Sequence, residues 1–285
     1  MSIALTDDHR ELGEVARSFL TAQQARWAAR QMLDAEAETH PSFWPELAGL
    51  GWLGLHIGEQ YGGSGFGLPE LVVVIDELGR AVAPGPFVPT VVVSSVIDAV
   101  GNDEQKARLL PGLVDGSVTA AIGFGGDVTV AGGRASGDAG VVLGAALADL
   151  LLVAAGADMV LVDRNADGVS VEVPRNLDRT RRSGKVALDG VSLGDNVIHG
   201  ARAAALARAR TLFAAEAVGG ASDCVETAVE YAKVREQFGR TIATFQAVKH
   251  HCANMLVAAE SAVGCVWDAA RAAGEDEDQF RLIAA

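Results

Sequence analysis

The chain has 285 residues, enough for about two domains at roughly 150 residues each and too long for a small disulfide scaffold. Hydrophobic residues make up 49% and charged residues 21%, which excludes a wholly disordered chain. The formal net charge of −14, with a pI near 4.8, repels phosphate backbones and anionic lipid, so neither nucleic acid nor membrane insertion is expected.

The N-terminal third predicts short helices. Thr6 can cap a first helix, since Asp7 and Asp8 follow it and place negative charge at the helix start. Pro41 and Pro69 are expected in the first turns of helices, and the glycine-rich stretch 47–68 between them reads as an ordered loop. Further helices are expected at 68–81, 87–100 and 102–115. Residues 1–116 are therefore predicted to be an all-helical domain.

Between residues 117 and 200 the pattern changes to short β-branched runs broken by glycine and aspartate. We expect a middle β domain here, a small sandwich or barrel, because no helical period separates the runs. The apolar stretch 141–162 contains Asp149 and Asp158 and predicts adjacent buried strands, not a membrane span. The stretch 163–168 copies half of a calcium loop, but Pro174 occupies the ligating twelfth position, so we expect no calcium and a hairpin turn at 165–168.

From residue 201 to 285 the helical period returns, and the stretch predicts two long helices that pack along narrow apolar seams. A third helix starts near Glu277, so the predicted C-terminal bundle (201–285) looks incomplete. The small residues of the first seam predict a close approach between helices. The expected fold class is α+β multidomain: N-terminal helices, a middle β domain and a C-terminal helical bundle.

Other candidate sites are weaker. Cys224, Cys252 and Cys265 lack a C-x-x-C spacing and are interpreted as reduced, buried thiols. Gly62 to Gly67 resembles a phosphate loop but lacks a preceding strand, which favours a structural loop. The adjacent His250 and His251 cannot form an i, i+4 metal pair, so no metal is predicted. No G-x-S-x-G elbow is present, although spacing alone leaves a Ser-His-Asp triad open. The chain starts without a secretory signal pattern, and a cytoplasmic location is expected.

The most informative segment is residues 231–246. A helix is expected to end near Phe238 and a new one to open near Thr244 with free amides. Arg235 and that helix start can together hold a phosphate or pyrophosphate. The alternative is an exposed arginine beside a turn.

The order of elements and two segments, EQYGGSGFGLPELVVVIDELGRAVAPGP and YAKVREQFGRTIATFQAVKHHCANM, resemble the acyl-CoA dehydrogenase family over the whole chain. The resemblance implies FAD shared between two subunits, with the helical bundle of one holding the pyrophosphate and adenine of the other's cofactor. It places Arg235, Gln237, Phe238 and Gln246 at those contacts. A guanidinium and carboxamides suit phosphate oxygens, and Phe suits packing on the cofactor.

The middle domain departs from the family pattern. An acidic Pro-Gly-Ala-Gly-Ser-Asp run is replaced by Gly-Phe-Gly-Gly-Asp at 123–127, and the Trp-Ile-Thr step that covers the flavin is replaced by Val-Val-Leu at 141–143. An alternative position for the catalytic glutamate, just before the arginine matched by Arg210, holds Ala209. We therefore nominate no catalytic residue, and we assign Arg210 to substrate binding by resemblance.

These kept and lost features favour one subunit of a heterotetrameric acyl-CoA dehydrogenase. Its four residues would contact FAD that is bound mainly by a homologous partner. The resemblance is to the split enzymes of actinobacterial steroid side-chain β-oxidation. The resemblance implies an acyl-CoA substrate and an electron-transfer flavoprotein as acceptor. Two alternatives stay open: a self-sufficient divergent homo-oligomer, and a flavin-free scaffold subunit.

Overall fold

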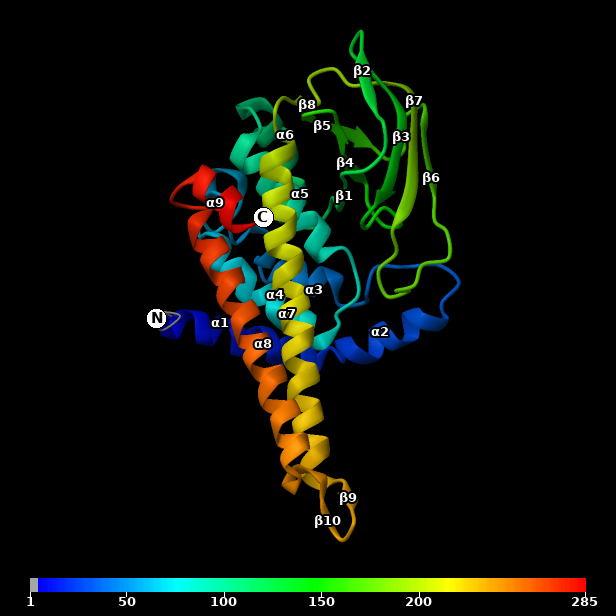
Figure 1. Ribbon diagram of the computed structural model, residues 1–285. Helices are drawn as coiled ribbons and strands as arrows, with labels where there is room; N and C mark the ends of the chain where they lie inside the picture. The colour runs from blue at the N-terminus through cyan, green and yellow to red at the C-terminus, as the bar shows by residue number, and fades with distance from the viewer. Residues whose placement is uncertain (1–4) are drawn as a thin grey trace.

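A computed structural model describes residues 5–285 (Figure 1). Helices from both ends of the chain pack together, and two β-sheets lie beside the upper part of this helical body. The expected fold class, N-terminal helices, middle β-sheets and a C-terminal helical region, is confirmed.

The N-terminal helices begin and end close to where the sequence predicts. Thr6 caps the first helix, because its hydroxyl accepts a hydrogen bond from the His9 amide at 3.2 Å. The helices are α1 (Asp7–Ala22), α2 (Ala25–Asp34), α3 (Trp44–Gly49), α4 (Leu68–Ala81), α5 (Phe87–Val100) and α6 (Asp103–Val114).

The two proline predictions have opposite outcomes. Pro69 lies in the first turn of α4, as expected. The assignment of Pro41 is wrong, since α3 begins three residues later at Trp44 and Pro45 occupies its first turn. Pro41 instead contributes a carbonyl that accepts from the Trp44 amide at 2.9 Å, in the turn that leads into the helix.

The glycine-rich segment between α3 and α4 is an ordered loop with two short 3₁₀ turns, Trp52–Gly54 and Glu59–Tyr61. The amides of Ser64, Gly65 and Phe66 donate to backbone carbonyls within the loop at 2.9 Å each. A Cβ at Gly63 would lie 2.0 Å from the Ile57 carbonyl oxygen, so only glycine fits there. These amides stabilise the loop, as its structural interpretation predicts.

The middle of the chain forms two four-stranded sheets. The first has the order β1-β4-β5-β8 and the second β2-β3-β7-β6. Apolar side chains from both sheets, including Val142, Leu151 and Val186, form a core of their own. The strands are β1 (Ala120–Gly123), β2 (Thr129–Ala131), β3 (Arg134–Val142), β4 (Leu150–Ala155), β5 (Asp158–Asp163), β6 (Val169–Glu172), β7 (Gly184–Ser192) and β8 (Val197–Ile198).

The predicted hairpin turn at 165–168 is wrong. The stretch does turn, since the Val169 amide donates to the Ala166 carbonyl at 3.1 Å. However, β5 pairs with β4 and β8, while β6 pairs with β7 in the other sheet. A hairpin requires its two strands to pair with each other, so this turn is a crossover between the sheets.

The C-terminal region contains two long helices, α7 (Arg202–Val234) and α8 (Gln246–Ala272), and the short α9 (Glu277–Ile283). A Cβ at Gly79 of α4 would lie 2.1 Å from the Glu216 carbonyl, and one at Gly219 would lie 2.1 Å from the Asp76 carbonyl. The close approach expected along the first seam therefore occurs between α7 and α4. The distal parts of α7 and α8 extend away from the body as an antiparallel pair (Figure 1).

The cysteine prediction is wrong in one respect. All three thiols are free, but Cys224 and Cys265 are exposed and Cys252 is half-buried. They lie on faces of α7 and α8 that no other element of the described chain covers fully. The division at residues 116/117 and 200/201 stays a prediction, since one apolar core joins helices from both ends of the chain. Within residues 5–285, no helix is both long and apolar enough to cross a bilayer.

Candidate functional site

Three of the four cofactor positions expected from the sequence lie at the tip of the α7–α8 pair, and the fourth begins α8. We call residues 235–246 the hairpin tip. Arg235 ends α7, and the strands β9 (Glu236–Gln237) and β10 (Arg240–Thr241) form a small hairpin. A 3₁₀ turn then leads to Gln246, the first residue of α8. The fold thus brings the four residues into one compact region.

The turn of this hairpin is strained at Phe238. Only Phe238 and Gly239 separate the paired residues Gln237 and Arg240, and both have positive φ, +54° and +73°. A two-residue turn of this kind favours Asn-Gly, because a bulky residue at positive φ carries a steric penalty. Phe238 is 91% exposed, so packing within this chain offsets little of that penalty. Such strain is typical of functional positions.

The hairpin tip has a local charge opposite to that of the whole protein. Residues 235–246 contain Arg235 and Arg240 against one acid, Glu236, a net charge of +1 in a chain of −14. The side chain of Arg235 has no ion pair or hydrogen bond within residues 5–285. Its guanidinium is therefore available to an anion.

The start of α8 offers further donors. Its N-cap is Phe245, whose side chain cannot cap the first-turn amides. Gln246 is exposed and follows directly. The positive end of the helix dipole, uncapped amides and a nearby guanidinium form an arrangement that suits phosphate oxygens.

Aromatic contacts order this region. The Arg240 guanidinium carbon lies 4.2 Å from the centroid of the Phe245 ring, and Phe238 meets Phe245 edge to face at 6.1 Å between centroids. The Thr244 hydroxyl donates to the Thr241 carbonyl at 2.6 Å. The hairpin tip is thus held in shape while the outer face of Phe238 stays open.

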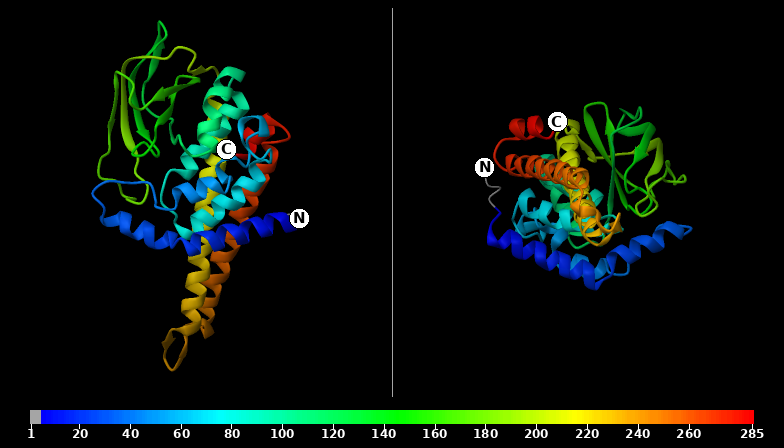
Figure 2. Two further views of the ribbon diagram at one scale, coloured as in Figure 1. Left: turned by 180° about the vertical axis from the view of Figure 1, so that it is seen from behind. Right: turned by 60° about the horizontal axis from the view of Figure 1, so that its bottom comes forward.

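The hairpin tip lies far from the β-sheets of its own chain. Figure 1 places β9 and β10 at one end of the molecule and both sheets at the other, and the reverse view in Figure 2 agrees. A cofactor held against these sheets is therefore out of reach of the same chain's hairpin tip.

Arg210 and Ala209 lie near the opposite end of α7. Arg210 and Val234 are separated by roughly 36 Å along α7 at 1.5 Å per residue. Arg210 is exposed and borders a shallow pocket with Cys265 and the C-terminal residues, while Ala209 is buried in the helical core. The expected substrate-binding residue and the four expected cofactor residues thus form two separate places, not one site.

The stretch that replaces the family's flavin cover offers few polar groups. The amide and carbonyl of Leu143 are both bonded to Ile122, at 2.8 and 3.1 Å. The side chains of Val141 and Leu143 are 58% and 39% exposed and have no polar atoms. These residues cannot pair with the polar edge of a flavin ring.

Leu143 also borders a cavity of about 350 Å³ between the sheets and the helices, which we call the interdomain pocket. Arg181 and Glu216 form an ion pair there, with side chains only 25% and 13% exposed. Burial raises the pKa of Glu38 to about 7, although its carboxylate accepts a hydrogen bond from the Arg182 amide at 2.7 Å. The pocket is lined by Glu38, Gly85, Pro86, Pro89, Leu143, Gly144, Asn176, Leu177, Asp178, Arg181, Ser183, Phe213 and Glu216.

This cluster was not predicted from the sequence. Arg182 donates to the carbonyls of Glu36 and Ala35 at 2.8 and 2.7 Å, across more than 140 residues of chain. The available signal was the basic run at 179–182, which is unusual in so acidic a protein. Its partners could not be predicted, because they lie far away in the sequence: Glu216 on α7, and Ala35 and Glu36 after α2.

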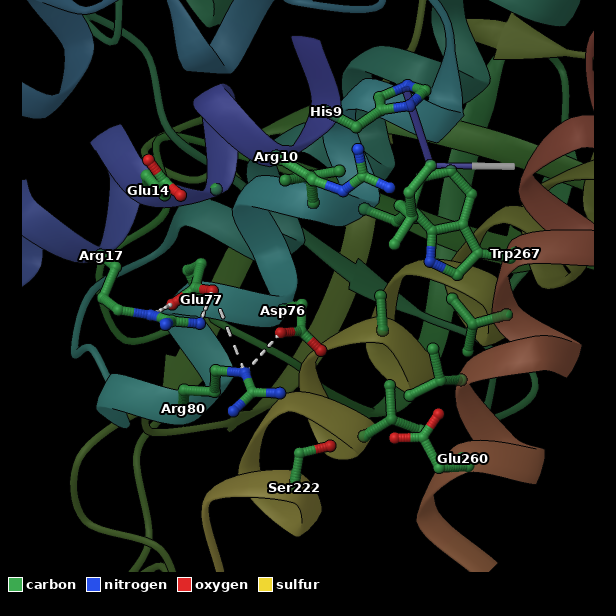
Figure 3. A pocket seen from close by; sticks show the side chains of 18 residues that line it. His9, Arg10, Glu14, Arg17, Asp76, Glu77, Arg80, Ser222, Glu260 and Trp267 are labelled. Carbon is green, nitrogen blue, oxygen red and sulfur yellow. Dashed lines mark hydrogen bonds and ion pairs between the residues drawn. The ribbon is translucent and has the colours of Figure 1, made fainter. Parts of the chain in front are cut away.

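A second cavity, of about 400 Å³, lies among α1, α4, α7 and α8 (Figure 3). Four of its charged side chains are paired: Arg17 bonds Glu77 at 2.7 and 3.0 Å, and Arg80 bonds Asp76 at 2.7 Å. No residue predicted from the sequence to bind a ligand lines it. The Arg17–Glu77 pair connects α1 to α4, whereas the Arg80–Asp76 pair lies within α4.

Sequence models of the acyl-CoA dehydrogenase N-terminal domain and C-terminal domain match residues 6–117 and 199–285. The chain belongs to the acyl-CoA dehydrogenase family. The acyl-CoA dehydrogenase FadE34 of Mycobacterium tuberculosis is 36% identical over the whole of this chain, which spans 40% of that protein's length. The acyl-CoA dehydrogenase IpdE2 of Mycolicibacterium smegmatis is 29% identical, with 93% of this chain and 77% of that protein aligned.

Solved structures of acyl-CoA dehydrogenases share the fold. A variant of the Tcur3481-Tcur3483 steroid acyl-CoA dehydrogenase is 35% identical, with a TM-score of 0.89 over 98% of this chain and 81% of that one. A chain of the ChsE4-ChsE5 complex from M. tuberculosis has a TM-score of 0.90 at 24% identity, covering 100% of this chain and 83% of that one. The family predicted from the two sequence segments is thus confirmed.

Proposed function

We propose that this chain is one subunit of a heteromeric acyl-CoA dehydrogenase and that its hairpin tip binds the FAD of a homologous partner subunit. The assembled enzyme would carry out α,β-dehydrogenation of an acyl-CoA thioester, with a steroid side chain as the candidate acyl group. The observation that carries the proposal is the position of the hairpin tip. Its unpaired anion-binding donors lie at the end of the molecule opposite its own sheets.

The residues of the hairpin tip fit the phosphate part of FAD. Arg235 would bind pyrophosphate oxygens, and Gln246 would donate to the same group from the start of α8. Phe238, already held outward by the turn, would pack against the adenine part, with Gln237 beside it. FAD, when bound, supplies the acceptor for the hydride removed from the acyl group. The contribution of this chain is to bind and orient the cofactor.

This chain's own sheets do not fit the flavin ring. Val141 and Leu143 offer no hydroxyl or aromatic cover, and the backbone groups of Leu143 are already paired. A flavin placed there would leave its polar edge unpaired. No residue of this chain is assigned as the catalytic base, since Ala209 has no titratable group. We therefore expect the partner subunit to bind the flavin ring and to supply the catalytic base.

Two comparisons support a partner subunit. The solved relatives Tcur3481-Tcur3483 and ChsE4-ChsE5 are each described by two protein names, as expected for assemblies of two different chains. FadE34, of which this chain spans 40%, has length for a second unit of similar size in the same chain. In a two-chain assembly, and in a longer single chain such as FadE34, a unit like this chain would be combined with a second unit of the family. We further propose an electron-transfer flavoprotein as the acceptor.

The deciding experiment compares FAD occupancy in the assembled complex with and without Arg235. Arg235→Ala should lower occupancy at least tenfold, because it removes a charge-assisted bond to the pyrophosphate. Arg30→Ala, at an exposed arginine on α2, is the matched control and should leave occupancy unchanged. Equal occupancy in the two variants would mean that the hairpin tip has no cofactor role.

The two alternatives make different predictions. A self-sufficient homo-oligomer would contain flavin when this chain is purified by itself. A flavin-free scaffold would assemble with a partner, yet Arg235→Ala would not change the flavin content. The unpaired donors and the strained Phe238 favour the shared site over the scaffold, because a scaffold has no use for either.

A further inference from the structure

Residues 174–183, in the connection between β6 and β7, form a compact loop with its own internal order. Figure 1 shows this connection reaching down from the sheets to the segment that follows α2. The side chain of Asn176 joins the two ends of the loop. Its amide group donates to the carbonyls of Pro174 and Ser183 at 2.9 and 3.1 Å, and its oxygen accepts from the Ser183 amide at 3.0 Å. We call residues 174–183 the strap, and the closed base allows it to move as one unit.

Two guanidinium groups of the strap bond the end of α2, where the last carbonyls of a helix have no partner inside the helix. Arg182 donates to the carbonyls of Ala35 and Glu36 at 2.7 and 2.8 Å, and Arg179 donates to the same Ala35 carbonyl at 2.7 Å. The Arg182 amide also donates to the Glu38 carboxylate at 2.7 Å. Arg182 therefore connects the strap both to the end of α2 and to the segment that follows it.

A second connection joins the strap to the helical body. Arg181 forms an ion pair with Glu216 of α7, and the two side chains are 25% and 13% exposed. The Arg182 carbonyl accepts a hydrogen bond from the Ala146 amide, in the segment between β3 and β4, at 3.4 Å. The strap is thus bonded to three separate parts of the fold.

All of these connections are polar. Of the strap residues, each of which the structure describes, only Thr180 and Arg182 are buried, and Leu177 is fully exposed. Neither apolar core of the described chain includes a strap residue. Segments with few buried apolar contacts open locally at a lower free-energy cost than the whole fold. We therefore expect the strap to open while the sheets and helices stay folded.

The strap forms one wall of the interdomain pocket. The strap residues that line this cavity are Asn176, Leu177, Asp178, Arg181 and Ser183. The other lining residues belong mainly to the start of α5, to α7 and to the segment after β3. Movement of the strap alone would therefore change access to the pocket, while the other walls stay in place.

We propose that the strap is a gate for the interdomain pocket and that it opens as one unit when the bonds of Arg182 to the end of α2 break. In the closed form described above, the strap covers one side of the cavity. In the open form, Arg182 and the Arg181–Glu216 pair exchange their protein partners for water. Arg182 is the positioning residue of the gate. The gate does not depend on the hairpin tip and does not rest on the proposed function.

The first test uses native-state hydrogen exchange in the natural chain. The Arg182 amide reports closure of the strap, because its acceptor is Glu38. The Leu161 amide of β5, which donates to the Asn196 carbonyl at 2.8 Å, reports the folded sheets. Protection at Arg182 should be at least tenfold lower than at Leu161. It should also be insensitive to low urea concentrations, because opening the strap exposes little apolar surface.

Two results of this experiment would overturn the gate. Equal protection and equal urea dependence at Arg182 and Leu161 would mean that the strap opens only when the whole fold opens. Exchange at the Ser183 amide as fast as at Arg182 would mean that the strap unravels, because the Ser183 amide is bonded inside the strap. A strap that moves as one unit keeps Ser183 more protected than Arg182.

The second test measures access to the interdomain pocket by thiol labelling. Phe213→Cys places a thiol on the α7 wall of the pocket, where the natural side chain is half-buried. The background removes the three natural thiols by substitution with serine at Cys224, Cys252 and Cys265. The rate of maleimide labelling then reports how often the pocket is open.

In this background, Arg182→Ala should raise the labelling rate at least tenfold, because it removes two charge-assisted hydrogen bonds that hold the strap closed. Arg175→Ala is the matched control within the strap. The Arg175 side chain is exposed and has no hydrogen bond or ion pair in the described part of the chain, so the rate should not change. Equal rates in the two variants would overturn the gate.

Thermal unfolding shows whether each variant keeps its fold, and if Arg182→Ala does not, the exchange experiment on the natural chain decides. Neither readout involves flavin or a partner subunit. The gate can therefore fail while the proposed function stands, and the proposed function can fail while the gate stands.

Discussion

The hairpin tip and the interdomain pocket both contain arginines, but the arginine of the pocket is ion-paired within the chain and, in the described part of the chain, Arg235 of the hairpin tip is not. In the pocket, Arg181 pairs with Glu216, and the neighbouring Arg182 donates to three backbone carbonyls within 3.4 Å. At the hairpin tip, the Arg235 side chain has no partner within residues 5–285, and Phe238 is strained and exposed. Paired charges stabilise this chain, whereas the unpaired ones are available to another molecule.

The largest expected effect comes from breaking the buried pair. Glu216→Ala should lower the free energy of unfolding by about 3 kcal/mol, because it removes the ion-pair partner of the largely buried Arg181 guanidinium. Urea unfolding of the isolated chain measures this change. The matched control is Glu226→Ala, whose partner Arg80 has other acids nearby and whose own side chain is 68% exposed; its cost should be below about 1 kcal/mol. Equal losses in the free energy of unfolding would show that the buried Arg181–Glu216 pair stabilises the chain no more than an exposed pair does.

The second prediction concerns Glu38 and pH. Burial raises its pKa from the usual 4.5 to about 7 in the folded chain, so the folded state binds a proton more tightly than the unfolded state. The stabilising contribution of the proton is complete below about pH 4.5 and is lost as the pH rises through about 7. Glu38→Gln should therefore flatten the decline in thermal stability across this window and should be more stable than the natural chain at pH 8. A parallel decline in both proteins would contradict the raised pKa.

The third prediction sharpens the contrast at Phe238. Phe238→Asn should stabilise the hairpin by about 1 kcal/mol, because asparagine tolerates the positive φ of this turn. The same variant should lower FAD occupancy in the assembled complex. Phe238→Ala is the control that removes the ring and keeps a residue ill-suited to positive φ. A loss of stability in Phe238→Asn would mean that the turn is not strained.

The smallest expected effect concerns Arg240. Arg240→Leu should destabilise the hairpin by about 0.5–1 kcal/mol, since it removes the guanidinium from the Phe245 ring in an exposed setting. Hydrogen exchange at the paired amides of β9 and β10 should become faster by a corresponding factor of a few. Arg240→Lys should restore part of the protection, and no change in either variant would exclude a role for this contact in ordering the tip.

The local parts of this fold were predictable and the long-range parts were not. Thr6 and Pro69 mark helix starts, because caps and first-turn prolines act within a few residues. The bounds of β2 and β3 could not be predicted, since the sequence from Thr129 to Val142 is rich in glycine and alanine and lacks a regular alternation. The crossover at 165–168 was mistaken for a hairpin because a turn does not reveal which sheet the next strand joins.

The candidate site also has a local part that could be predicted and a long-range part that could not. The four residues of the hairpin tip were found together because they lie within twelve residues of one another and match a family segment. The contacts of Arg181 and Arg182 with Glu216, Glu36 and Ala35 join segments far apart in sequence. No local pattern in one sequence predicts such contacts.

The central claim is that this chain contributes to a cofactor site completed by another subunit. The most direct test measures native mass together with the visible flavin spectrum, for this chain alone and for the complex with its homologous partner. Our account predicts flavin only in the mixed oligomer. A yellow homo-oligomer of this chain would contradict it.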